Sequence, residues 1–190
     1  MNATIILIGP LGAGKSTIGR LLADKLDLPL CTVDHVRQAY YEEVGYDEVL
    51  AAEIAASDQG IQGVIRYSKP FEFQMVQRVL AEHHGIIDFG ASNSVYDDTD
   101  LMAQVELVLA PFPNVILLLP SADVEESAAI LKKRLIRMLN EAGKEFTDEL
   151  FELNRYFIEH PSNYQLANLI IYTKDKTPEA ICEEILQRLA

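Results

Sequence analysis

Nine consecutive residues near the start of the chain have the types and spacing needed to hold a phosphate group. Residues 9–17 read GPLGAGKST and fit the pattern G-x-x-x-x-G-K-[ST]. In this pattern backbone N–H groups of a glycine-rich loop surround the phosphates, the lysine reaches the β- and γ-phosphates, and the next hydroxyl binds Mg²⁺. A glycine-rich turn with a lysine at the start of a helix is the simpler alternative. We predict that a nucleoside triphosphate is bound by Gly9, Gly12, Ala13, Gly14, Lys15, Ser16 and Thr17.

The residues on either side of this loop supply the setting that the motif requires. Residues 4–8 are a β-branched, apolar run that predicts a buried strand. After the loop, Ile18, Leu21, Leu22 and Leu26 recur at helical spacing. Because the helix begins at the loop, the positive end of its dipole adds to the attraction for phosphate. Strand, loop and helix together favour phosphate binding over a simple turn.

Asp88 is the first candidate for an acid that works with the loop. It follows Ile86 and Ile87 in a short apolar strand, where a carboxylate is costly unless it is paired or linked to a metal ion. We predict that Asp88 and Ser16 together hold Mg²⁺, with Asp88 acting through a water molecule. The alternative is an aspartate that caps a helix or forms a turn.

Asp34 is the second candidate acid, at the end of a strand predicted over residues 28–33. The carboxyl ends of parallel strands meet at one edge of a sheet, so Asp34, Asp88 and the loop should share that edge. There Asp34 could orient or deprotonate an acceptor hydroxyl. Equally, it could be the N-cap of a helix that starts near Val36.

Four basic residues late in the chain are candidates for a mobile cover over the phosphates. They are Lys132, Lys133, Arg134 and Arg137. A solvated helix face is the alternative, and it is the more common role of such a cluster.

Strand and helix patterns alternate along the rest of the chain. Apolar runs at residues 86–89, 115–119 and 169–172 predict strands, and the segments between them predict helices, with Pro70 ending an irregular region over residues 46–70. This alternation indicates an α/β protein with a parallel sheet and right-handed crossovers. Neither repeats nor a linker appear, so we expect one domain over residues 1–190.

The composition of the chain argues against several classes of binding partner and cellular location. The formal net charge of −13 argues against a nucleic-acid or anionic-membrane surface. No apolar run approaches the length of a membrane span, and the N-terminus lacks the features of a signal peptide. Cys31 and Cys182 match no metal or redox spacing, which is typical of buried thiols. We expect a cytoplasmic protein, monomeric or dimeric.

Residues 9–26 closely resemble the opening of the shikimate kinase branch of small P-loop kinases, in the nucleoside monophosphate kinase superfamily. Weaker similarity continues to the end, at residues 164–171 and 177–179. The resemblance implies a three-layer fold with a five-stranded parallel sheet of order 2-3-1-4-5. It also implies a substrate-side region at about 35–85, a lid at about 132–150, and Arg134 on the adenine side.

The chain departs from the family pattern on the acceptor side. The family's Asp-x-Asp reads Thr32-Val33-Asp34, and its triple-glycine loop reads GASN at residues 90–93. A substrate-binding arginine is replaced by Glu72, and a second one falls at His160, with Arg155 nearby but out of register. Glutamate and histidine cannot replace arginines that clamp a carboxylate. We therefore do not expect shikimate to be the acceptor.

Together these residues predict an ATP- and Mg²⁺-dependent kinase that acts on a hydroxyl of a small molecule. Lys15, Asp34 and Asp88 would carry the chemistry, and residues 46–70, with Arg66, Tyr67 and Lys69, would build the acceptor pocket. One alternative is a nucleotide-binding switch or slow NTPase without an acceptor site. Another is a nucleoside or nucleotide kinase that holds an acceptor phosphate with Arg66 or the basic cluster.

Overall fold

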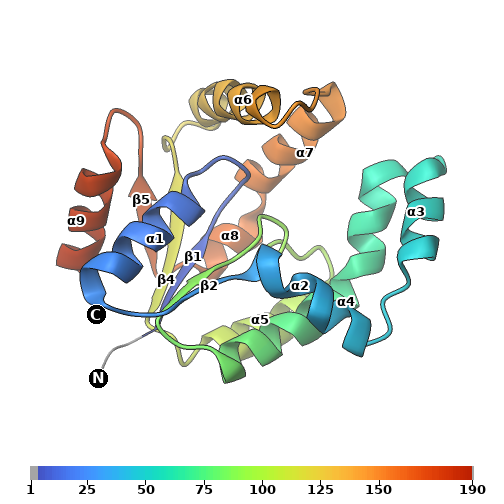
Figure 1. Ribbon diagram of the computed structural model, residues 1–190, viewed down its shortest axis with the longest axis horizontal. Helices are drawn as coiled ribbons and strands as arrows, with labels where there is room; N and C mark the ends of the chain where they lie inside the picture. The colour runs from blue at the N-terminus through green and yellow to red at the C-terminus, as the bar shows by residue number, and fades with distance from the viewer. Residues whose placement is uncertain (1–3, 190) are drawn as a thin grey trace.

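Short apolar runs form a parallel sheet at the centre of the molecule. The computed structural model describes residues 4–189 (Figure 1). Within them a five-stranded sheet has the order β2-β3-β1-β4-β5, which confirms the predicted order. The strands are β1 (Ile5–Ile8), β2 (Leu30–Thr32), β3 (Ile86–Asp88), β4 (Asn114–Leu119) and β5 (Leu169–Tyr172).

Alternation along β1 shows how both faces of the sheet are covered. Ile5 and Leu7 pack in one cluster with α1 (Lys15–Leu26) and α9 (Pro178–Arg188). Ile6 and Ile8 pack on the opposite face, mainly with α4 (Gly60–Glu82), α5 (Thr99–Leu109) and α8 (Pro161–Leu166). Successive side chains of a strand point to opposite faces, so fully buried strands need apolar residues at every position.

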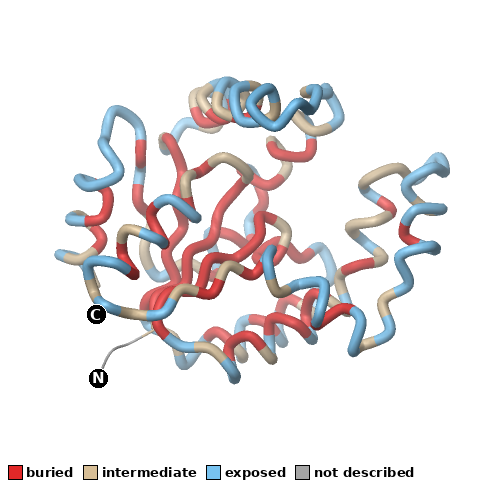
Figure 2. Tube along the Cα trace, in the orientation of Figure 1, coloured by how far each residue is buried: buried red, intermediate tan, exposed pale blue. Residues whose placement is uncertain are grey.

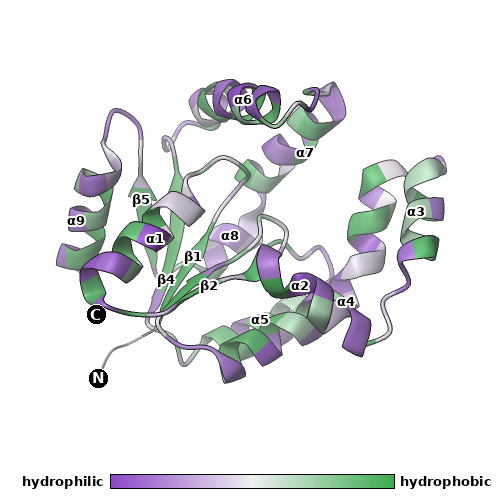
Figure 3. Cartoon of the chain, viewed as in Figure 1, coloured by the Kyte–Doolittle hydropathy of each residue, from purple (hydrophilic) through white to green (hydrophobic). Residues whose placement is uncertain are grey.

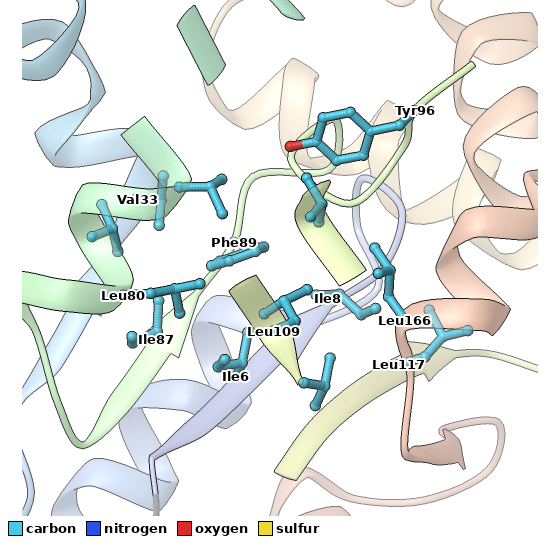
Figure 4. Packing of buried hydrophobic residues seen from close by; sticks show 14 of the residues in the cluster. Ile6, Ile8, Val33, Leu80, Ile87, Phe89, Tyr96, Leu109, Leu117 and Leu166 are labelled. Carbon is cyan, nitrogen blue, oxygen red and sulfur yellow. The ribbon is translucent and has the colours of Figure 1, made fainter. Parts of the chain in front are cut away.

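Burial and hydropathy follow this arrangement. The strands are the most buried part of the chain in Figure 2, and Figure 3 shows them largely apolar, whereas the surrounding helices carry mixed faces. Figure 4 shows Ile6 and Ile8 of β1 meeting Leu80, Leu109 and other side chains in the larger cluster. The three central strands, β3, β1 and β4, are buried at every residue and give the strand ends a rigid base.

Four further helices lie around the strand ends that carry the candidate residues. They are α2 (Val33–Glu43), α3 (Glu48–Ala56), α6 (Val124–Glu141) and α7 (Asp148–Glu159). In Figure 1, α6 and α7 lie beyond the loop between β1 and α1, and α3 with the first half of α4 projects to the other side. The candidate site is therefore flanked by two helical regions.

Three helix boundaries differ from the sequence-based expectation. Helix α4 runs through Pro70, where we predicted that an irregular region would end. Pro70 and Arg66 are both exposed, so the Arg66 carbonyl that loses its helical N–H partner lies on the solvent side of the helix. Helix α2 begins at Val33 rather than near Val36, and α8 was not predicted.

Side chains cap two of the helices near the candidate site. Asp123 and Thr147 cap α6 and α7 by accepting hydrogen bonds from Glu126 N and Leu150 N. Cys31 and Cys182 are free, buried thiols. Between residues 4 and 189, no helix has both the length and the apolar character needed to cross a membrane.

Candidate active site

The glycine-rich loop owes its shape to three glycines with positive φ. Gly9, Gly12 and Gly14 have φ of +137°, +74° and +102°, a region that residues with a β-carbon rarely adopt. A Cβ on Gly9 would also lie 2.6 Å from Leu118 O. Gly14 is the N-cap of α1, and no side chain caps that helix. The N–H groups of the first turn therefore face the loop, where an anion can accept from them.

The ammonium group of Lys15 lies against the loop. Its Nζ donates to Gly9 O at 2.8 Å and to Pro10 O at 3.1 Å, and the side chain is buried. Burial lowers the pKa of Lys15, while the nearby Asp88 and Asp34 carboxylates raise it. The ammonium group is thus placed on the loop between the glycines and two acids.

Asp88 ends β3, beside Leu7 of β1 and Thr32 of β2 in the sheet register. Its side chain is buried, and burial is the largest influence raising its pKa. A hydrogen bond with Ser16 and the charge of Lys15 act in the opposite direction. Among the described residues, Asp88 Oδ2 has no hydrogen-bond partner. The carboxylate therefore has a free, buried oxygen next to the Ser16 side chain.

These two side chains suit Mg²⁺. The ion prefers oxygen ligands and usually combines one or two carboxylates with phosphate oxygens and water. Ser16 and the unpartnered Oδ2 of Asp88 would supply the protein's part of such a shell. A cluster of three or more His, Cys, Asp or Glu side chains able to hold a metal does not occur within residues 4–189.

Asp34 lies in the first turn of α2, so the alternative that it is the N-cap of this helix is wrong. Thr32 is the N-cap and makes no side-chain capping bond. The half-exposed Asp34 carboxylate lies 3.7 Å from Arg37 Nη1. A Cβ on Gly90 would meet Asp34 Oδ1 at 2.7 Å, so glycine at position 90 permits this close approach. Asp34, Asp88 and Lys15 lie close enough at this edge of the sheet for both carboxylates to raise the pKa of Lys15.

A cavity of about 510 Å³ opens beside the loop, between α1, α6 and α9. Loop residues 12–18 line one wall, and Arg134 and Arg137 of α6 line another. Arg134 Nη1 donates to Gly12 O at 3.3 Å, and burial lowers the pKa of this arginine. This cavity has room for the remainder of a nucleotide whose phosphates sit in the loop.

The predicted basic cluster is divided by the structure. Arg134 and Arg137 face the cavity beside the loop. Lys132 instead lies over the rings of Phe146 and Phe151, and Lys133 is exposed. Only part of the cluster is therefore placed to meet a nucleotide.

A second cavity, of about 340 Å³, lies on the other side of the loop, within the predicted substrate-side region. It is lined from α2, α3, α4 and the loop after β3 by Arg37, Gln38, Tyr41, Tyr46, Glu48, Ala51, Val64, Ile65, Ser68, Glu72 and Ser92. Arg37 links it to Asp34, and Ser92 lies two residues after Gly90. We call this cavity the acceptor pocket.

Residues 46–70 supply six of the lining residues of this pocket, but Arg66, Tyr67 and Lys69, which we expected to take part, are not among them. Arg66 is exposed and bonds Gln59 Oε1, and Tyr67 accepts from Asp47 N. Lys69 Nζ donates to Glu72 Oε2 at 2.6 Å. Farther away, His160 is buried between Asp97, at 3.2 Å, and Ser162, at 2.6 Å, while Arg155 pairs with Glu125 and Glu159. Neither His160 nor Arg155 is among the pocket's lining residues.

The sequence analysis missed Asn154, and it missed that Lys69 and Glu72 pair with each other. Asn154 of α7 is buried, accepts from Leu11 N at 2.8 Å and donates to Leu11 O at 3.2 Å. Glu72 pairs with Lys69 at 2.6 Å and accepts from the Ser92 hydroxyl at 2.7 Å. No local pattern points to Asn154, whereas the i, i+3 spacing of Lys69 and Glu72 was a usable signal.

Comparison with known proteins, by sequence and by structure, finds similarity to shikimate kinases. A family model described as shikimate kinase matches residues 11–58. The chain is 28% identical to a shikimate kinase from Rhodococcus jostii, covering 100% of this chain and 99% of the relative. The solved structure of shikimate kinase from Acinetobacter baumannii in complex with shikimate is 20% identical, with a TM-score of 0.61 over 97% of this chain and 91% of that one. A shikimate kinase from Enterococcus faecalis is 30% identical, and the alignment covers 98% of each chain. With its phosphate-binding loop on a P-loop kinase sheet and this similarity over nearly its whole length, the chain belongs to the shikimate kinase family.

Proposed function

We propose that the protein transfers the γ-phosphoryl group of ATP, with Mg²⁺, to a hydroxyl of a small molecule other than shikimate. The observation that carries this proposal is the gathering of Lys15, Ser16, Asp88 and Asp34 at one edge of the sheet, between two cavities. The cavity beside Arg134 would take the nucleotide. The acceptor pocket would present a hydroxyl to the phosphates from the side of Asp34.

Each of these side chains has a distinct task in phosphoryl transfer, which depends on positioning and charge neutralisation. Bound Mg²⁺ would neutralise part of the charge on the triphosphate. Lys15 would leave the carbonyls of Gly9 and Pro10 and donate to the γ-phosphate. Asp34 would accept the proton of the acceptor hydroxyl as its oxygen bonds to the γ-phosphorus. The bond from that phosphorus to the bridging oxygen breaks, and ADP leaves.

The substitution of Glu72 and His160 for the family's arginines supports an acceptor other than shikimate. Glu72 lines the acceptor pocket and carries a negative charge where the resemblance implies an arginine. His160 is buried and occupied by Asp97 and Ser162. Neither can form the bidentate contact with a carboxylate that arginine provides.

The test is Mg²⁺-dependent ADP release from ATP, with and without candidate acceptors. We expect stimulation by a hydroxyl compound, and a loss of at least about 100-fold in Lys15→Ala, because its ammonium group is the main positive charge on the loop. Lys25→Ala is the matched control, since Lys25 lies on the same helix in a surface pair with Glu183 at 3.6 Å. Full activity of Lys15→Ala would refute the proposal. ATP binding without transfer to any acceptor would instead favour a nucleotide-binding switch.

The position of Arg66 argues against the alternative of a kinase that phosphorylates a nucleotide. An acceptor phosphate would need a free cation at the acceptor pocket. Arg66 is exposed outside that pocket, and the basic cluster of α6 borders the other cavity.

A further inference from the structure

We infer that the acceptor pocket takes a polyhydroxylated molecule that carries no carboxylate or phosphate, and that the ion pair between Lys69 and Glu72 imposes this choice. The inference rests on the proposed function, because it names the substrate class of the same site. It follows from the partners of each charged group at the pocket, taken in turn.

Two of the three donors of Lys69 are used in hydrogen bonds within the protein. Its Nζ donates to Glu72 Oε2 at 2.6 Å and to Ser92 O at 2.7 Å, and it lies 5.0 Å from the centre of the Tyr96 ring. An ammonium group has three donors. The side chain is only 11% exposed, so a ligand has little access to it. The positive charge of Lys69 is therefore used within the protein.

Glu72 presents the negative member of this pair to the pocket. Its side chain is 4% exposed, Oε2 faces Lys69, and Oε1 accepts from the Ser92 hydroxyl. Both Glu72 and Ser92 line the pocket wall. A carboxylate or phosphate seated against this wall would meet a like charge, which is unfavourable.

Arg37 is the other cation at the pocket, and it too has a carboxylate partner. It lies 3.7 Å from Asp34, the proposed proton acceptor, so an anion bound by Arg37 would compete with Asp34 for it. Glu48 adds a further negative charge on the lining and accepts from Gln38. Two cations near the pocket, Arg37 and Lys69, are thus outnumbered by three carboxylates. These are Asp34, Glu48 and Glu72, so the net charge of this group is negative.

The uncharged part of the lining suits hydroxyl groups. Tyr41 and Tyr46 give the pocket aromatic surface, and the Tyr46 hydroxyl lies 3.3 Å from Ser68 Oγ. Apolar faces with a few convergent hydroxyl and carboxylate groups fix the orientation of a polyol, whose hydroxyls both donate and accept. An amino group in place of one hydroxyl would also be accepted beside Glu72.

Acceptors that differ only in charge test the inference in the wild-type protein. Gluconate, glucitol and 1-amino-1-deoxyglucitol form one series, and shikimate and its methyl ester form another. With MgATP, we expect ADP release to favour the uncharged or amino members by about tenfold or more in kcat/KM over the carboxylates. A carboxylate that works as well as its uncharged twin would overturn the inference while leaving the kinase proposal intact. No stimulation by any member, with ATP bound normally, would overturn both.

Two variants show whether the ion pair is responsible. Glu72→Gln removes the negative charge and leaves Lys69 uncompensated, so use of gluconate and shikimate should rise by about tenfold in kcat/KM. The matched control is the double variant Lys69→Met/Glu72→Gln, which removes the Glu72 charge without leaving an uncompensated cation and should therefore gain these carboxylates less than Glu72→Gln does. Equal gains in both variants would refute a charge-based choice. The wild-type series decides the substrate class even if either variant fails to fold.

Discussion

Asn154 offers a direct test of how the phosphate-binding loop is held in shape. Its amide bonds both the N–H and the C=O of Leu11, in the middle of the loop's variable segment. Asn154→Leu keeps similar volume but removes both bonds. Each is worth about 1 kcal/mol net, so the variant should lose about 2 kcal/mol of folding stability. For a chain of this size that corresponds to a fall in Tm of about 4–8 °C.

The effect of Asn154→Leu on ATP affinity shows whether Asn154 positions the loop or only contributes to packing. If Asn154 holds the Leu11 peptide in its binding conformation, part of the same free energy is lost again when ATP binds. Losing all of it would weaken the Kd for ATP by about thirtyfold. Isothermal titration with ATP and Mg²⁺ measures this directly, and Tm in the absence of ligand measures the structural part.

Phe157→Leu is the matched control for that experiment. Phe157 lies on the same helix and belongs to the buried cluster against which Leu11 packs. The substitution trims this packing and keeps both Asn154 bonds, so it should lower Tm while the Kd for ATP stays at the wild-type value. If Asn154→Leu behaves in the same way, lowering Tm with an unchanged Kd, then Asn154 is only a packing residue and the argument fails.

Two further predictions concern the acids. Because burial raises the pKa of Asp88 in the folded protein above its unfolded value, its protonated form favours folding, and that stabilisation is lost as pH rises through the folded pKa. Asp88→Asn should therefore have a higher Tm than wild type at pH 7, and this difference in Tm should shrink toward pH ~4. The variant should also need more Mg²⁺ for ADP release. A lower Tm than wild type at pH 7 would contradict this account. Gly90→Ala places a Cβ 2.7 Å from Asp34 Oδ1, so it should reduce kcat by up to about 100-fold with little change in KM for ATP, measured by steady-state kinetics. An unchanged kcat would mean that the position of Asp34 does not matter.

The half of the site that binds phosphate could be predicted because its determinants are local. The loop, its strand and its helix are contiguous in sequence, and three glycines have the positive φ that the motif requires. Asp34 and Asp88 could be placed because parallel strands end at a common edge. Asn154 could not, since it reaches Leu11 across 143 residues with no periodicity to indicate it.

The predicted helix boundaries were wrong where the surrounding structure tolerates a residue that local sequence rules exclude from helices. We predicted that Pro70 ends an irregular region, yet α4 runs through it because the proline ring and the freed carbonyl of Arg66 both lie on the exposed side. Downstream, residues such as Phe73 and Val76 are buried against the sheet and favour continuation. The strand before Asp34 was predicted too long because β2 pairs with β3 over only three residues, and α2 starts directly afterwards.

The acceptor side was harder to predict because the meaning of a charge depends on its partner. Lys69 and Arg37, taken as residues in a sequence, indicate a site for an anion. In the folded protein Lys69 is bonded to Glu72 and Ser92, and Arg37 lies against Asp34, so neither charge is free. A buried pair of this kind offers an anion no net positive charge, whereas an unpaired lysine would attract one. Charge inventories of a pocket therefore predict substrate class only after each group has been assigned its partner, and at this pocket that assignment favours an uncharged or cationic polyol.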